Sequence, residues 1–144
     1  MFFVEERKTS ARLLQNNTMK EPIILSGKVV HGKALGRTVG MPTANLCIEN
    51  GTIPEDGVYA TRISVNGKSH ISVTNIGRRP TVDNESNITV ETYIIDFDRE
   101  IYGEQAVLEV HEFLRPVQKF ESLQEVQKQV QEDVKTAKIY FAEK

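Results

Sequence analysis

The stretch from Gly27 to Asn45, GKVVHGKALGRTVGMPTAN, combines residue types that suit phosphate chemistry. Four of the nine glycines of the chain lie in it, at positions 27, 32, 36 and 40. Glycine adopts positive φ angles without a Cβ penalty, so such a loop can turn its amide N–H groups toward an anion. Arg37 adds a planar cation that binds phosphate through two hydrogen bonds. The same glycines also suit ordinary turns between strands, and spacing alone leaves both interpretations open.

The stretch ends in Met41-Pro42-Thr43-Ala44-Asn45, where Pro42 fixes its own φ and disfavours a helical conformation for Met41. In an extended chain the side chains of Thr43 and Asn45 point to the same side. Their oxygens are hard ligands, which could hold Mg²⁺ beside a phosphate-binding loop. The alternative is that both residues form the polar side of a strand.

A third reactive group is the carboxylate of Glu91, in the predicted strand Ile88–Phe97. By the two-residue period of a strand, its side is shared by Tyr93, Ile95 and Phe97. A carboxylate held partly out of water in such a row can act as a general base near neutral pH. A glutamate on the solvent side of a strand is the alternative, and the pattern alone favours it.

These groups must be positioned by short β segments, because the chain from Ile23 onward is rich in β-branched residues separated by turns. Asn66-Gly67 between two such segments predicts a tight hairpin. Short strands without intervening helices predict a mainly β fold, a closed antiparallel barrel of Greek-key type with about six strands. The segments identified are Ile23–Val30, Gly57–Val65, Lys68–Asn75, Ile88–Phe97 and Ala106–Leu114.

One amphipathic helix is predicted at the C-terminal end, after a capping box formed by Ser122 and Glu125. Apolar residues recur there at steps of three and four, which indicates a stripe that packs on the barrel. The acidic residues and lysines of the helix are interpreted as its solvated side. The stripe consists of Leu123, Val126, Val130, Val134, Ala137 and Phe141.

The composition is that of an ordinary globular protein of 144 residues with a net charge of −2. This charge argues against a broad basic surface, so nucleic-acid binding is not expected. The single cysteine, Cys47, excludes an internal disulfide and is predicted to be buried. No apolar run is long enough to span a membrane, and the acidic N-terminus predicts a cytoplasmic protein. We expect residues 1–22 to form an appendage or linker and residues 23–144 the barrel domain.

Several spaced motifs occur together in the chain. The sequence resembles the riboflavin kinase (flavokinase) family over residues 24 to 142, and specifically the kinase module of bacterial bifunctional riboflavin kinase/FAD synthetases. No HxGH-type motif of an adenylyltransferase domain is present, so adenylyl transfer is not expected. In family order the motifs are Gly40-Met41-Pro42-Thr43-Ala44-Asn45, Gly57-Val58-Tyr59-Ala60, Asn75-Ile76-Gly77, Val90-Glu91-Thr92-Tyr93, Ile101-Tyr102-Gly103, Leu114-Arg115-Pro116 and Lys119-Phe120.

The resemblance implies transfer of the γ-phosphoryl group of ATP to the 5′-hydroxyl of riboflavin, with Mg²⁺ as the metal and FMN as the product. It implies that Glu91 is the catalytic base and that Thr43 and Asn45 are the metal ligands. Nucleotide binding would fall to Gly32, Gly36, Arg37, Gly40, Pro42, Thr43 and Tyr102. Flavin binding would fall to Arg115, Gln118 and Phe120.

Some alternatives remain open. Phe120 could instead be a hydrophobic staple before the last helix, and Tyr102 could serve core packing. A flavin-sensing regulatory module, or a small barrel that binds protein or RNA, are competing functions. The presence of Thr43, Asn45 and Glu91 favours the enzyme, and the near-neutral charge disfavours RNA. Riboflavin and ATP are then the expected partners of a monomeric protein.

Overall fold

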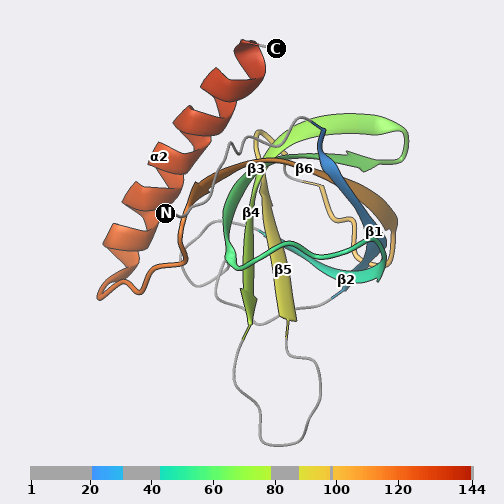
Figure 1. The fold of residues 1–144 in the computed structure, drawn as a ribbon, viewed down its shortest axis with the longest axis horizontal. Helices are drawn as coiled ribbons and strands as arrows, with labels where there is room; N and C mark the ends of the chain where they lie inside the picture. The colour runs from blue at the N-terminus through green and yellow to red at the C-terminus, as the bar shows by residue number, and fades with distance from the viewer. Residues whose placement is uncertain (1–20, 31–42, 79–87, 98, 144) are drawn as a thin grey trace, which may run out of the picture.

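The structure is a computed structural model that describes residues 21–30, 43–78, 88–97 and 99–143. Six antiparallel strands close into a barrel in the order β1-β2-β5-β4-β3-β6 (Figure 1). The segment β6-β3-β4-β5 has the strand order of a Greek key. The elements are β1 Ile23–Val30, β2 Ala44–Asn50, β3 Gly57–Val65, β4 Lys68–Arg78, β5 Ile88–Ile94, β6 Gln105–Arg115 and α2 Leu123–Ala142.

The predicted closed antiparallel barrel with one C-terminal helix is confirmed. The bounds of β1 and β3 match the prediction, whereas β2 was not among the predicted strands, although a strand was the alternative considered for Thr43 and Asn45. Within β2 the side chains of Ala44 and Leu46 are buried, and those of Asn45 and Cys47 alternate with them and turn outward. The prediction that Cys47 is buried is wrong, because this alternation places its thiol on the exposed side.

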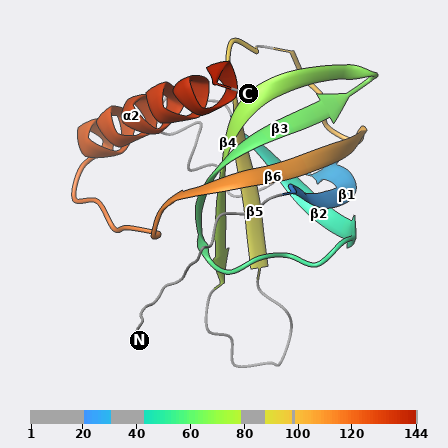
Figure 2. The same ribbon diagram turned by 45° about the horizontal axis from the view of Figure 1, so that its top comes forward.

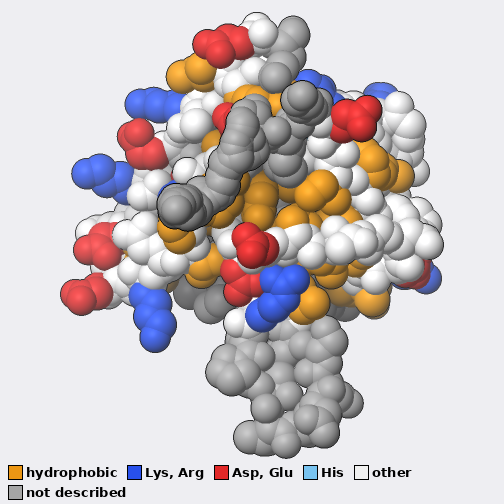
Figure 3. Space-filling model, in the orientation of Figure 1, with side chains coloured by type: hydrophobic (Ala, Val, Ile, Leu, Met, Phe, Trp, Pro, Cys, Tyr) orange, Lys and Arg blue, Asp and Glu red, His pale blue; other side chains and the backbone are white. Residues whose placement is uncertain are grey.

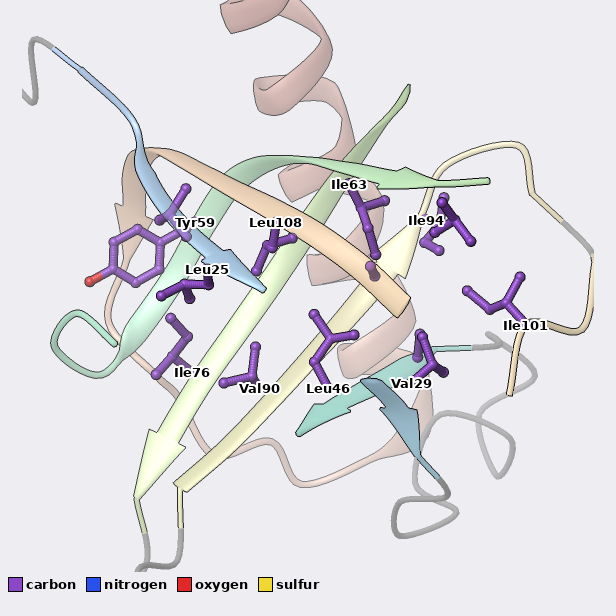
Figure 4. Close-up of a cluster of buried hydrophobic side chains, with 14 residues drawn as sticks. Leu25, Val29, Leu46, Tyr59, Ile63, Ile76, Val90, Ile94, Ile101 and Leu108 are labelled. Atoms are coloured by element: carbon purple, nitrogen blue, oxygen red, sulfur yellow. The ribbon is translucent and has the colours of Figure 1, made fainter. Parts of the chain in front are cut away.

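The inside of the barrel is a packed core to which all six strands contribute (Figure 4). Leu25, Ile63, Ile76 and Leu108 are fully buried there, each at an inward position of its strand. Among these apolar side chains runs a chain of buried hydroxyl groups. The oxygens of Thr61 and Ser72 are 2.7 Å apart, those of Thr61 and Thr74 2.8 Å, and those of Thr74 and Thr92 2.9 Å. Each buried hydroxyl therefore has a hydrogen-bond partner.

Strand β5 ends at Ile94, so the prediction of a strand extending to Phe97 is wrong. The N–H of Ile95 donates a hydrogen bond to the carbonyl of Ile71 at 3.1 Å, and Asp96 adopts a φ of 57°. This turn breaks the two-residue alternation on which the prediction relied. Glu91 therefore shares its side of β5 with Tyr93, and not with an apolar row that includes Ile95 and Phe97.

Helix α2 lies along the outside of the barrel against β3 and β4 (Figure 2). Ala137 and Phe141 of the helix pack on Val58, Ala60 and Val73 in a second apolar cluster. The predicted stripe thus covers the barrel in the second half of the helix. At its start the side chain of Leu123 is 50% exposed, so this residue of the stripe does not pack as predicted.

The predicted helix cap is confirmed: the Ser122 hydroxyl accepts a hydrogen bond from the N–H of Glu125 at 3.1 Å. The Glu125 carboxylate accepts from the N–H of Glu121 at 3.0 Å, which satisfies a further donor at the helix start.

No helix among the described residues is long and apolar enough to cross a membrane.

Candidate active site

Thr43 and Glu91 are 48 positions apart in the sequence, and the barrel brings them into direct contact. Ala44 and Asn45 at the start of β2 pair with Thr92 and Glu91 of β5. Thr43 directly precedes this paired segment, and its hydroxyl donates a hydrogen bond of 2.6 Å to Oε2 of Glu91. Both side chains are half-buried, so the contact is partly shielded from water while remaining accessible to a ligand.

Asn45 completes a group of oxygen-bearing side chains, because it lies directly opposite Glu91 across the β2–β5 pair. Its neighbours Ala44 and Leu46 point into the core, so its amide points outward with the Glu91 carboxylate. Residues directly opposite each other in an antiparallel pair have Cβ atoms about 4.5–5.5 Å apart. Thr43, Asn45 and Glu91, predicted as metal ligands and catalytic base, therefore form one cluster.

This cluster suits a hard divalent cation. A threonine hydroxyl has one proton and two lone pairs, and the proton of Thr43 is directed at Glu91. Its lone pairs therefore remain available to a cation, as does the amide oxygen of Asn45. Among the described residues no group of three or more His, Cys, Asp or Glu side chains is arranged to hold a metal ion. A small number of neutral oxygen ligands fits Mg²⁺, which usually keeps waters and substrate phosphates in its shell.

The strand register extends this cluster into a row around the outside of the barrel. Glu91 of β5 pairs with Asn75 of β4, which pairs with Val58 of β3. Val58 in turn pairs with Arg115 at the end of β6. In the view of Figure 3, hydrophobic side chains are exposed near the middle of the molecule, with acidic and basic side chains below them. The row connects the Glu91 cluster with the segment between β6 and α2, where the predicted flavin residues lie.

Arg115, predicted as a flavin contact, forms an ion pair with helix α2. Its Nη2 lies 2.8 Å from Oδ2 of Asp133, and its Nε lies 3.0 and 3.2 Å from the two carboxylate oxygens. A further N–H of Arg115 donates to the carbonyl of Pro116 at 3.2 Å. Asp133 is only 4% exposed and also accepts from Gln129 at 3.1 Å. Most of the hydrogen-bonding capacity of Arg115 is therefore used in fixing β6 to α2.

The other two predicted flavin residues follow Arg115 in residues 116–122. The guanidinium of Arg115 lies 5.8 Å from the centre of the half-buried Phe120 ring, within cation–π range. Gln118 is exposed. The ion pair with Asp133 thus sets the point from which this segment leaves the barrel, and it contacts the aromatic ring that was predicted to meet the flavin.

Tyr102 lies in the turn between β5 and β6, and its side chain is 52% exposed. This exposure does not support the alternative that it serves core packing. The turn is held to the end of β1 by two hydrogen bonds of 2.9 Å, from Gly103 N–H to Val29 and from Val29 N–H to Glu104. Tyr102 is therefore near the point where β1 leads into the Gly-rich stretch. The predicted nucleotide residues Gly32, Gly36, Arg37, Gly40 and Pro42 lie outside the described residues.

Asp133 was not predicted as a buried residue, because the acidic residues of the helix were interpreted as solvated. That interpretation is wrong for this residue. A signal was present, since an aspartate between Val130 and Ala137 at steps of three and four lies within the apolar stripe. A buried carboxylate at such a position needs a cationic partner, which is Arg115.

A second ion pair that was not predicted lies at the end of β4, the last described position before residues 79–87. The backbone N–H and the guanidinium of Arg78 both bind the carboxylate of Asp56, and the guanidinium also donates to Pro54 at 3.2 Å. In the same loop, the Tyr59 hydroxyl donates to the carbonyl of Glu55 at 2.7 Å. Burial, together with the charges of Glu55 and Asp56, raises the pKa of Tyr59 to about 12.

A cavity of about 430 Å³ opens at one end of the barrel, between the β3–β4 hairpin and the residues that follow β5. None of the predicted site residues in the described part of the chain lines it, and Thr43, Asn45 and Glu91 are among these. The His70 ring meets the edge of Phe97 there, with ring centres 4.9 Å apart. Its lining residues are Val65, Asn66, Lys68, His70, Asp96, Phe97 and Arg99.

Fold and site together define a class of small Greek-key barrels that carry a hydroxyl, an amide and a carboxylate on the outer wall after a Gly-rich stretch. The family model described as "Flavokinase: Riboflavin kinase" matches residues 19–141. The chain therefore belongs to the riboflavin kinase family.

Individual proteins agree with this membership. The bifunctional riboflavin kinase/FMN adenylyltransferase of Listeria monocytogenes is 38% identical over 128 residues, which cover 88% of this chain and 41% of the relative. The chain thus spans about two-fifths of the length of such curated relatives.

Two solved structures resemble the barrel. The riboflavin kinase from Trypanosoma brucei has a TM-score of 0.58 and 25% identity, over 85% of this chain and 81% of its own. A crystal structure described as a macrolide-efflux protein from Streptococcus pneumoniae has a TM-score of 0.77 and 32% identity. That match covers 81% of this chain and 38% of the other.

Proposed function

We propose that the protein transfers the γ-phosphoryl group of ATP to the 5′-hydroxyl of riboflavin, giving FMN and ADP. The observation that carries this proposal is the 2.6 Å hydrogen bond from Thr43 to Glu91, with Asn45 in register beside it, in a chain of the riboflavin kinase family. Phosphoryl transfer requires alignment of two substrates and neutralisation of charge more than covalent work by the protein. The cluster places the Glu91 carboxylate, which can act as a base, next to Thr43 and Asn45, whose oxygens can bind a cation.

Glu91 has two carboxylate oxygens with different tasks in this mechanism. Oε2 accepts the hydrogen bond from Thr43, which fixes the orientation of the carboxylate. Oε1 is then the oxygen that accepts the proton of the 5′-hydroxyl. As this proton leaves, the hydroxyl oxygen forms a bond to the γ-phosphorus, and the bond from that phosphorus to the bridging oxygen of ADP breaks. ADP departs with the electron pair of the broken bond.

Thr43 and Asn45 are the residues that would hold Mg²⁺. When bound with ATP, the ion supplies neutralisation of the phosphate charge. Thr43 would have a double role in this arrangement, because its proton is donated to Glu91 and its lone pairs would be free to bind the cation. Tyr102 and the glycines at 32, 36 and 40 are proposed to bind the nucleotide, together with Arg37 and Pro42.

Phe120 and Gln118 are proposed to contact the flavin, with the phenyl ring against the planar isoalloxazine. Arg115 is predicted from the sequence as a further flavin contact, and its guanidinium is bound to Asp133. We assign it to positioning: it fixes the start of the segment that carries both flavin contacts.

The direct test is incubation of the purified protein with riboflavin, ATP and Mg²⁺, followed by chromatographic separation of riboflavin from FMN. The proposal predicts FMN in proportion to ADP, and no product when Mg²⁺ is removed with a chelator. Binding of riboflavin without formation of FMN would contradict the kinase and favour a flavin-sensing module.

A further inference from the structure

Asn75 is placed next to the proposed base by the strand register. It lies directly opposite Glu91 across the β4–β5 pair, as Asn45 does across the β2–β5 pair. Glu91 is therefore flanked by two asparagines, one on each neighbouring strand. Opposed residues of this kind have Cβ atoms about 4.5–5.5 Å apart, so both amides are within reach of a group bound at the carboxylate.

The side chain of Asn75 points to the same side of the barrel wall as that of Glu91. Its neighbours Thr74 and Ile76 are fully buried in the barrel interior, so the alternation of the strand turns Asn75 outward. The residue is exposed, and within the described part of the chain its amide makes no hydrogen bond. Packing therefore gives no reason for an asparagine at this position.

The two asparagines face different parts of the proposed reaction. Asn45 lies on the side of Thr43, where the cation and the phosphates would bind. Asn75 lies on the opposite side, toward Val58 and then Arg115 along the same row. With the flavin at residues 116–122, as proposed above, the acceptor substrate would leave Glu91 on the side of Asn75, so the part next to the reacting hydroxyl would lie beside this amide.

That part of the substrate is a chain of hydroxyl groups. A hydroxyl both donates and accepts hydrogen bonds, and a carboxamide offers an acceptor oxygen and two donor protons. We infer that Asn75 binds the ribityl hydroxyls next to the 5′-position and thereby selects a polyhydroxylated acceptor. This inference rests on the proposed function, and it adds a specificity-determining residue to that site.

The test compares Asn75→Ala with the parent in steady-state kinetics for both substrates. The loss of a hydrogen bond predicts a decrease of kcat/KM for riboflavin by about 3- to 10-fold. The KM for ATP and the melting temperature should not change, because the side chain packs against nothing in the core. Asn50→Ala is the matched control, since Asn50 is an exposed asparagine on β2 outside this row, paired with Ser26.

A second acceptor makes the test specific for the hydroxyl chain. A flavin whose N10 substituent is a 5-hydroxypentyl group keeps the reacting hydroxyl and lacks the others. The parent should have a higher kcat/KM for riboflavin than for this analogue. Asn75→Ala should lower the ratio of the two kcat/KM values by about the same factor by which it lowers kcat/KM for riboflavin.

The results distinguish the role of Asn75 from the proposed kinase activity. If the parent forms FMN and Asn75→Ala leaves the preference for riboflavin unchanged, the role of Asn75 is overturned and the kinase stands. An equal loss of kcat/KM for riboflavin and for the 5-hydroxypentyl flavin is the same result and also overturns the role of Asn75. If the parent forms no FMN, the proposed function fails, and the assignment of Asn75 fails with it.

Discussion

Thr43 and Glu91 act as one unit at the scale of single residues, because the hydroxyl of one orients the carboxylate of the other. Their roles were predicted from a family motif, and the barrel adds the contact between them. The sequence could not supply that contact, since it depends on the pairing of β2 with β5. Nor could it supply the partner of Arg115, which is 18 positions away on another element.

Thr43→Val removes the hydroxyl with little change in shape. It should lower kcat/KM by about 10- to 100-fold, the range expected for a hydrogen bond to a charged group. It should also raise the Mg²⁺ concentration needed for half-maximal activity, because a cation ligand is lost. Thr43→Ser keeps both the proton and the lone pairs and is the control. Equal activity of the valine and serine variants, measured as FMN formed, would exclude Thr43 from the site.

At the scale of elements, the ion pair between β6 and α2 determines how the proposed flavin segment is held. Helix α2 and its cap followed from periodicity and from the Ser122–Glu125 spacing. The end of β5 could not be predicted from periodicity, because Ile95 and Phe97 continue the alternation in the sequence although the backbone turns at Asp96. Strand β2 was missed because its seven residues show the alternation over a short distance only.

Asp133→Asn tests the positioning role of this ion pair. Losing one partner of a buried pair costs about 3–5 kcal/mol, and the 18% exposure of Arg115 reduces this to roughly 2–4 kcal/mol in unfolding by urea. The KM for riboflavin should rise while the KM for ATP stays within twofold. Glu132→Gln removes the same charge one position away at an exposed site and should change neither quantity. Equal increases in both KM values would indicate a general loss of structure.

At the scale of the whole molecule, the barrel is closed by pairings that no local pattern encodes. Alternating hydrophobicity and the Asn66-Gly67 turn predicted five of the six strands and one hairpin, which is confirmed as the β3–β4 pair. The loop before β3 is tied to the end of β4 by Arg78 and Asp56, and Tyr59 is buried beneath it. These contacts join segments about 20 positions apart, and they became visible only in the folded chain.

The raised pKa of Tyr59 predicts a loss of stability at alkaline pH. Its pKa of about 12 in the folded state lies above the ordinary value of 10.0, so the folded state favours the protonated phenol. The contribution is complete below pH 10 and is lost as the pH rises toward 12. Tyr59→Phe should cost about 1 kcal/mol at pH 8, and the stability difference from the parent should shrink above pH 10 and change sign before pH 12, because only the parent loses stability there. A difference that stays constant over this range would contradict the burial of an ionisable phenol.

The central claim is that Glu91 activates the 5′-hydroxyl of riboflavin, and Glu91→Gln tests it most directly. Glutamine keeps the size of the side chain, so the variant should fold and bind both substrates. General-base catalysis contributes about 10²–10⁴-fold, and we predict a fall in kcat of that size in single-turnover formation of FMN. Residual activity is expected, because alignment and charge neutralisation remain. A variant that forms FMN at the rate of the parent would show that Glu91 is a structural strand residue and would contradict the mechanism.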